Sequence, residues 1–213
     1  MISCIFTGTV FYAQQNAVGS WWIYFGNKQL SERWNIHHEA QYRAYNFLDD
    51  LEQLLIRGGV GYNLTPNNNN LLLGYGFIHN ENYLTGADRK SEFNEHRLYA
   101  QFITRQQFSR IHLQHRYRFE QRFMPGEIRY RFRYFLAANL PLNNAVLTDN
   151  TYYLSAYNEI FIHTDRSVFD RNRTYLGIGY RINSNVRVEA AYLNQSISRK
   201  ARNQINIATF VNF

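Results

Sequence analysis

Arginine and glutamate alternate with apolar residues along several stretches of this 213-residue chain. In residues 111–123 every even position is His, Gln, Arg or Glu, whereas the odd positions are mainly Ile, Leu, Tyr and Phe. Residues 128–136 repeat the pattern, with arginine at positions 129, 131 and 133. A period of two residues places the charged side chains on one face of a β-strand. The pattern therefore predicts a charged wall whose guanidinium and carboxylate groups can pair with each other or bind anions.

The basic residues are almost all of one kind. Twenty of the 23 are arginine, and the lysines are Lys28, Lys90 and Lys200. Arginine binds carboxylates and phosphates bidentately and is less strongly hydrated than lysine, so it is favoured where a charge is enclosed. With a formal net charge of +7, we expect many of these arginines to face something other than bulk water.

Serine and histidine residues raise the question of an outer-membrane lipid-modifying enzyme. Such an enzyme needs a nucleophile beside a base on a barrel strand. Ser155 lies in a predicted strand, and His96, His112, His115 and His163 are available. However, the expected strand pairing brings no serine beside a histidine or a carboxylate. We therefore expect no enzymatic activity and keep lipid modification only as a second alternative.

Metal and nucleic-acid sites are also weakly supported. His37 and His38 are neighbours on a predicted strand and point to opposite faces, so they cannot chelate one metal ion together. We expect neither a metal nor another cofactor. Residues 129–134 alternate basic and aromatic side chains as an RNA-binding sheet does, but on a strand the two kinds fall on opposite faces. We therefore expect no nucleic-acid partner.

Alternating segments fill the chain from residue 20 onwards and predict an all-β protein. No run of 18 apolar residues occurs, which excludes a transmembrane helix. An aromatic content of 17% argues against disorder. The sequence Met124-Pro125-Gly126-Glu127 predicts a tight turn between two strands. Eleven candidate strands lie near residues 20–26, 34–44, 52–64, 70–80, 95–104, 111–123, 128–136, 152–163, 171–182, 186–195 and 204–213.

The alternation fits two kinds of barrel with opposite faces inside. A soluble barrel buries its apolar face, whereas a membrane barrel turns that face to lipid and its polar face to the lumen. The predicted strands, at roughly 10–13 residues, are long enough to cross a bilayer at a tilt. Tyrosine and phenylalanine near the strand ends and arginine and glutamate in the polar columns also favour the membrane. We expect an antiparallel transmembrane β-barrel of 10–12 strands in the outer membrane of a Gram-negative bacterium, with a soluble all-β fold as the alternative.

The number of strands conflicts with this topology. Bacterial single-chain barrels have an even number, so that both termini return to the periplasm. Counted back from Phe213, the turns at 64–70, 107–110 and 182–185 are periplasmic, and the loops 80–94 and 163–172 lie outside. The segment 20–26 then points the wrong way. We expect that it is not a wall strand or that a further strand within 140–152 completes the barrel, which gives 10 or 12 strands.

Both ends of the chain carry features typical of exported barrels. Residues 1–13 resemble the apolar region and cleavage end of a secretory signal, without a positive n-region, and a short first strand is the alternative. Residues 14–213 then form a single barrel. The terminal Phe213 is typical of the insertion signal read by the barrel-assembly machinery. That machinery, the lipid bilayer and other envelope proteins are the expected partners.

The inward columns predict a strongly charged lumen. Charges there must be paired or hydrated. The first interpretation is a mostly ion-paired lumen in a structural or accessory component of the envelope or of an outer-membrane complex. The alternative is a narrow anion-favouring pore or a binder of an acidic ligand, because the arginines are in excess. The columns contain Arg43, Arg57, Arg97, Arg116, Arg118, Arg122, Arg129, Arg131, Arg133, Arg171, Arg173, Arg181 and Arg187, with Glu39, Glu95, Glu120, Glu159 and Glu189.

The charged columns also resemble a known family. Taken together they look like DUF2490, a group of uncharacterised proteins from Gram-negative bacteria, and Ala13-Gln14-Gln15 resembles the signal ends of Bacteroidota proteins. The resemblance covers nearly all of residues 20–213. It implies an outer-membrane β-barrel with no established activity, so no functional residue is carried over. The segments that resemble the family are 39–43, 95–97, 115–122, 129–134, 158–159 and 169–173.

Overall fold

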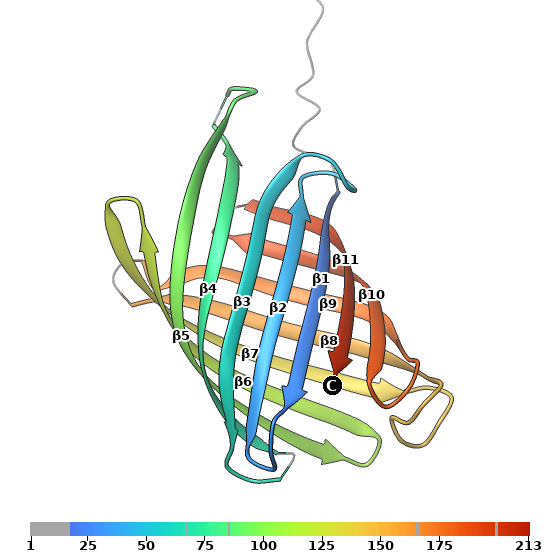
Figure 1. Cartoon of the computed structure of the whole chain (residues 1–213). Helices are drawn as coiled ribbons and strands as arrows, with labels where there is room; N and C mark the ends of the chain where they lie inside the picture. Colours follow the sequence, from blue (N-terminus) through green and yellow to red (C-terminus); the bar gives the residue numbers. More distant parts are fainter. Residues whose placement is uncertain (1–17, 67, 85, 165–166, 199) are drawn as a thin grey trace, which may run out of the picture.

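Eleven strands of 11 to 19 residues form one closed barrel in the computed structural model (Figure 1), which describes residues 18–66, 68–84, 86–164, 167–198 and 200–213. The predicted all-β barrel is confirmed. The predicted signal segment, residues 1–13, lies outside the described residues. The strands are β1 (Gly19–Gln29), β2 (Trp34–Ala44), β3 (Leu51–Asn63), β4 (Asn69–Tyr83), β5 (Lys90–Phe108), β6 (Ile111–Met124), β7 (Glu127–Pro141), β8 (Thr151–His163), β9 (Phe169–Arg181), β10 (Val186–Ile197) and β11 (Lys200–Asn212).

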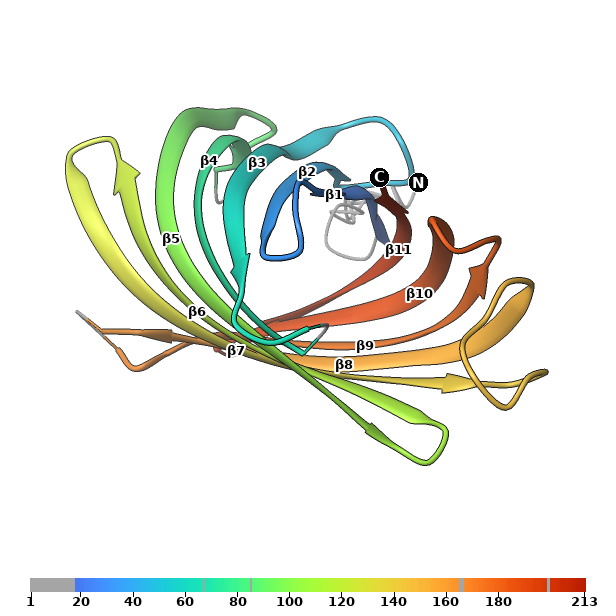
Figure 2. The same cartoon turned by 60° about the horizontal axis from the view of Figure 1, so that its bottom comes forward.

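The barrel closes through one parallel pair of strands. Every strand pairs antiparallel with its neighbours in sequence, whereas β1 and β11 pair parallel, from Gly19 opposite Gln204 to Asn27 opposite Asn212 (Figure 2). A ring with an odd number of strands needs one such pair. The number of strands lies within the predicted range of 10–12, but the expectation of an even number, 10 or 12, is wrong. Segment 20–26 belongs to the wall strand β1, and residues 142–150 form a loop between β7 and β8.

The connections between strands alternate between the two ends of the barrel. Those that follow β1, β3, β5, β7 and β9 share one end with Phe213, here called the C-terminal end; the others lie at the N-terminal end, where β1 begins (Figure 1). The predicted grouping of the turns at 64–70, 107–110 and 182–185 is confirmed. The predicted loop 80–94 is shorter, because β4 and β5 continue their pairing out to Tyr83 and Lys90.

The tight turn between β6 and β7 is also confirmed. Met124 pairs with Glu127, so that Pro125 and Gly126 alone connect the two strands. No helix formed by the described residues is long and apolar enough to span a membrane.

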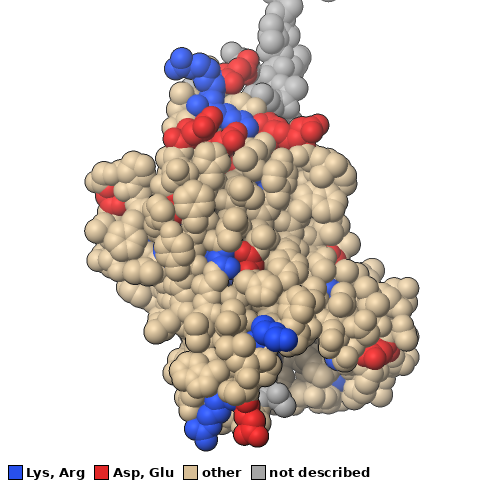
Figure 3. All heavy atoms as spheres, viewed as in Figure 1, with Lys and Arg blue, Asp and Glu red and all other residues tan. Residues whose placement is uncertain are grey.

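The wall is apolar outside and polar inside. Among the described residues, 25 buried ones are polar or charged and only 11 are hydrophobic. Leu73 and Leu176 on the outer face are 72% and 61% exposed, whereas Arg118 and Glu120 on the inner face are 2% and 1% exposed. Figure 3 shows a mainly uncharged surface across the strands, with charged side chains gathered towards the two ends. The strands therefore present their predicted columns in the orientation opposite to that of a soluble barrel.

Inward-facing glycines make room for large side chains from neighbouring strands. A Cβ on Gly179 would lie 2.1 Å from the ring of Tyr153, and one on Gly74 would lie 2.3 Å from the ring of Tyr99. Both tyrosines are buried. Each of these two rings therefore occupies the space above a glycine. The other inward glycines of β3, β4 and β9 lie against Leu72, Asn35, Arg57 and Ala191.

We expect Gly179→Ala to destabilise the barrel by roughly 1–3 kcal/mol, because the added methyl group overlaps the buried Tyr153 ring. The free energy of unfolding in urea, measured on the barrel refolded in detergent, checks this. Gly58→Ala is the matched control, because a Cβ there lies 3.8 Å from its nearest neighbour. The control should change stability by less than about 1 kcal/mol. Equal effects of the two substitutions would contradict the packing argument.

Candidate functional site

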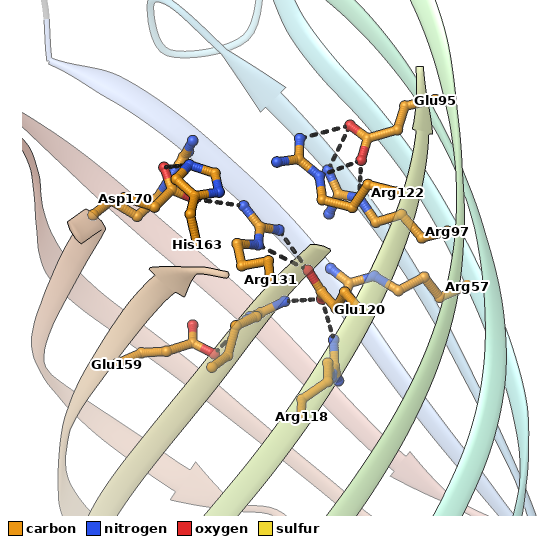
Figure 4. A network of polar contacts seen from close by, with 12 residues as sticks. Arg57, Glu95, Arg97, Arg118, Glu120, Arg122, Arg131, Glu159, His163 and Asp170 are labelled. Carbon is orange, nitrogen blue, oxygen red and sulfur yellow. Dashed lines mark hydrogen bonds and ion pairs between the residues drawn. The ribbon is translucent and has the colours of Figure 1, made fainter. Parts of the chain in front are cut away.

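Glu120 stands at the centre of the ion pairs in the lumen. The pairing of β6 with β7 places it opposite Arg131, which donates to Oε2 through Nη2 at 2.6 Å and Nε at 3.0 Å (Figure 4). Arg133 donates through Nη1 to Oε1 at 2.6 Å, and Arg118 Nη1 lies 3.6 Å from Oε1. A carboxylate buried this deeply is tolerated only with such partners. Three arginines therefore share one glutamate.

Two further glutamates extend the network along the wall. Arg133 reaches Glu159 on β8, with Nη2 2.6 Å from Oε1, and Arg116 Nη2 lies 2.8 Å from the same oxygen. Glu95 on β5 accepts hydrogen bonds from Arg97 and Arg122, whose Nε atoms are 2.6 and 2.5 Å from Oε1. Each carboxylate thus serves at least two guanidinium groups. The predicted ion-paired lumen is confirmed.

Two acidic residues join the network where the strands bulge. Asp170 Oδ2 lies 2.9 Å from Arg131 Nη1, and Glu52 Oε1 lies 2.7 Å from Arg202 Nη1. Each is the extra residue opposite a register shift, Asp170 in β9 and Glu52 in β3. A bulge interrupts the alternation of faces. Strict alternation would place both side chains on the outer face, so the sequence pattern did not predict them as lumen residues.

The arginines of this network outnumber the carboxylates even after these additions. Against twelve arginines stand seven carboxylates, an excess of five formal positive charges among the described residues. These residues of the lumen therefore carry a net positive charge. The arginines are Arg43, Arg57, Arg97, Arg116, Arg118, Arg122, Arg129, Arg131, Arg133, Arg171, Arg173 and Arg202, and the carboxylates are Glu39, Glu52, Glu95, Glu120, Glu127, Glu159 and Asp170.

The excess charge surrounds a cavity of about 200 Å³. It lies towards the N-terminal end, where β3 and β5 begin and β4 and β6 end. A volume of this size holds on the order of six water molecules or one small solute. Its charged lining consists of nine arginines and two glutamates, namely Arg43, Arg57, Arg97, Arg122, Arg129, Arg131, Arg133, Arg171 and Arg173 with Glu52 and Glu95.

The remaining predicted lumen charges lie apart from this cavity. Arg181 approaches Asp149 at 3.7 Å, and the guanidinium of Arg187 lies 4.1 Å from the ring centroid of Phe210, both towards the C-terminal end. Glu39 Oε1 lies 3.3 Å from Arg57 Nη2, on the side of the cavity that faces the C-terminal end. The structure therefore brings most of the predicted set together and leaves Arg181 and Arg187 outside.

Glu189 departs from the predicted ion pairing. Its carboxylate accepts hydrogen bonds from the hydroxyl groups of Tyr153, Ser155 and Tyr175 at 2.9, 3.2 and 2.7 Å. The expectation that no serine lies beside a carboxylate is therefore wrong. Two glycines on the strand between explain these contacts, because Gly177 lies opposite Ser155 and Gly179 lies opposite Tyr153, so neither position places a side chain between them and Glu189 on β10. That the protein is not an enzyme stays a prediction.

The two adjacent histidines lie on opposite sides of the wall. His37 Nε2 is 3.7 Å from the inward Glu39, whereas the ring of His38 packs outside, 5.9 Å from that of Phe213. The part of the chain that the structure describes contains no cluster of three or more His, Cys, Asp or Glu side chains suited to a metal ion.

We expect Glu120→Gln to destabilise the barrel by roughly 3–5 kcal/mol, because Arg131, Arg133 and Arg118 lose the carboxylate that they share. The shift of the urea midpoint of the refolded protein measures the effect. Glu92→Gln removes the same charge from an exposed position and serves as the control, with an expected change below about 0.5 kcal/mol. A wild-type midpoint for Glu120→Gln would show that the network contributes nothing to stability.

The sequence match covers almost the whole barrel. Residues 18–206 match a family described as a protein of unknown function, DUF2490, and this span runs from the start of β1 into β11. Neither a curated protein nor a solved structure matches the chain. As the charged columns predicted, the chain belongs to the DUF2490 family.

Proposed function

We propose that the protein is an outer-membrane β-barrel that binds a small anionic ligand in its lumen. The apolar outer face supports the membrane location, because a wall that exposes leucine and isoleucine and buries arginine gains stability in lipid rather than in water. Strands of 11 or more residues are long enough to cross the hydrocarbon layer. In this arrangement Phe213 remains the proposed signal for the barrel-assembly machinery.

The orientation follows from the proposed insertion signal. With the C-terminal end in the periplasm, the N-terminal end and its cavity face the outside of the cell. Solutes from outside the cell would then reach the cavity without first crossing the outer membrane. Other envelope proteins remain proposed partners for either end.

The observation that carries the binding function is the lining of the cavity, with nine arginines and two glutamates. Like charges held together in a partly enclosed space repel one another, and a bound anion relieves this repulsion. Pockets for drug-sized ligands are usually about 300–1,000 Å³, so the cavity of about 200 Å³ suits a small anion or the charged end of a larger one.

The ion pairs beside the cavity favour binding over free permeation. Arg133 connects Glu120 on β6 with Glu159 on β8, and Arg57 on β3 points towards Glu120 from the other wall (Figure 4). These side chains are only 1–5% exposed, so they leave little space for solvent in this part of the lumen. The narrow anion-favouring pore is therefore the weaker of the two anion hypotheses.

Binding predicts that multivalent anions stabilise the folded barrel according to the law for a ligand of the native state. The unfolding free energy from urea titrations of refolded protein should rise with the logarithm of the phosphate, sulfate or citrate concentration above Kd, and the gain should be about 2.7 kcal/mol at a hundredfold excess over Kd. Sodium chloride at the same ionic strength is the control. Shifts that follow ionic strength alone would contradict the binding function and leave the structural interpretation of the lumen.

If the lumen is closed, the barrel should not conduct ions. In planar bilayers, barrel shown to be folded by heat-modifiable gel migration should give no single-channel steps. Steps with anion preference that weaken in Arg131→Gln would instead favour the pore.

A further inference from the structure

We propose that the ligand is a dianionic tetrahedral oxyanion, such as phosphate or the end group of a soluble phosphate monoester, held by Arg43, Arg173 and Trp21. This inference rests on the anion-binding function proposed above. It assigns the subsite within the cavity and the chemical class of the ligand.

Arg43 and Arg173 differ from the other cavity arginines in what holds them. Arg43 Nη1 donates to Gln53 Oε1 at 2.8 Å, and its Nε donates to Gln41 Oε1 at 3.0 Å. Arg173 Nε donates to Gln195 Oε1 at 2.8 Å. These amide oxygens orient the guanidinium groups without neutralising them. Among the described carboxylates, Arg43 has none within 4.0 Å, and Arg173 has only Glu159, at 3.7 Å.

Trp21 brings the two arginines to one place. The guanidinium carbons of Arg43 and Arg173 lie 3.8 and 4.6 Å from its ring centroid, so the two carbons are separated by no more than the sum of these distances. Cation–π contact offsets part of the repulsion between them. The Trp21 side chain is buried and lines the cavity, and its indole N–H has no acceptor among the residues that the structure describes. A buried donor left without a partner costs free energy that a bound acceptor recovers.

The donors of this subsite match a tetrahedral dianion better than a carboxylate. A carboxylate can accept from several arginines, as Glu120 does, but its two oxygens lie in one plane and carry one negative charge. Phosphate carries two charges and presents oxygens in tetrahedral directions, so it can accept from two arginines and an indole that approach from different sides. Two negative charges also offset more of the excess of five in the network. Because Arg43 and Arg173 line the lumen, the ligand comes from solution and not from the headgroup of a bilayer lipid.

Isothermal titration calorimetry of the folded barrel with inorganic phosphate at pH 8 tests the proposal. Arg43→Gln and Arg173→Gln should each raise the Kd for phosphate about tenfold or more, since each removes charge-assisted hydrogen bonds. Arg187→Gln removes the same charge outside the cavity and should bind as the wild type does. Trp21→Phe keeps an aromatic ring, removes the N–H and should weaken binding less than the arginine substitutions.

These variants should fold. Arg43 pairs with no described carboxylate, and Glu159 retains Arg133 and Arg116 when Arg173 is replaced. Gel migration of the folded form verifies each variant before titration.

The possible outcomes separate the two proposals. If the wild type binds neither phosphate, sulfate nor citrate, both fail. If it binds phosphate but Arg43→Gln and Arg173→Gln bind it as Arg187→Gln does, only the subsite is wrong. Acetate bound as tightly as phosphate would overturn the ligand class. Phosphate binding abolished by vesicles that contain phosphatidic acid would show that a lipid headgroup occupies the site.

Discussion

The cost of enclosing charge governs this barrel. Its wall presents apolar side chains outwards, so the charged side chains of the same strands face the lumen and lie close to one another there. There an unpaired ion costs several kcal/mol, and arginine with its planar fork of donors is the cation best able to share a carboxylate. Glu120, Glu159 and Glu95 each take two or more arginines from different strands. Together with the pair between Arg131 and Asp170, these pairs connect the strands from β5 to β9.

The alternation of residue types was enough to predict the wall and its two faces. The columns in 111–123 and 128–136 gave the correct inward residues because a strand has only two faces and one carries nearly all the charge. The parallel closure was missed for a different reason. The eleven candidate strands already make segment 20–26 run in the same direction as the last strand, which is the direction that the structure shows. The prediction rejected this direction because bacterial single-chain barrels have an even number of strands.

Parts of the site escaped the sequence for local reasons. Asp170 and Glu52 turn inwards at bulges, and one extra residue reverses the face without changing composition. Trp21 was overlooked because residues 20–26 contain no charged side chain that marks an inward face. The alternation in its strand placed Glu189 correctly on the inner face, but its predicted ion pairing was wrong. Its hydroxyl partner Tyr153 reaches it over a glycine of the strand between, and such a contact between strands cannot be read from the alternation within one strand.

The stability of the network and its proposed binding function are connected through the same excess of arginine. A lumen built only for rigidity would gain most from equal numbers of the two charges, because each unmatched guanidinium adds repulsion and desolvation cost. In this barrel the ion-paired part of the network centres on Glu120, whereas glutamine and tryptophan hold Arg43 and Arg173. Neutral acceptors fix the geometry of these cations and leave their charge available. The position of the unmatched charge, beside a cavity at one end of the barrel, is what the proposed binding function requires at that end.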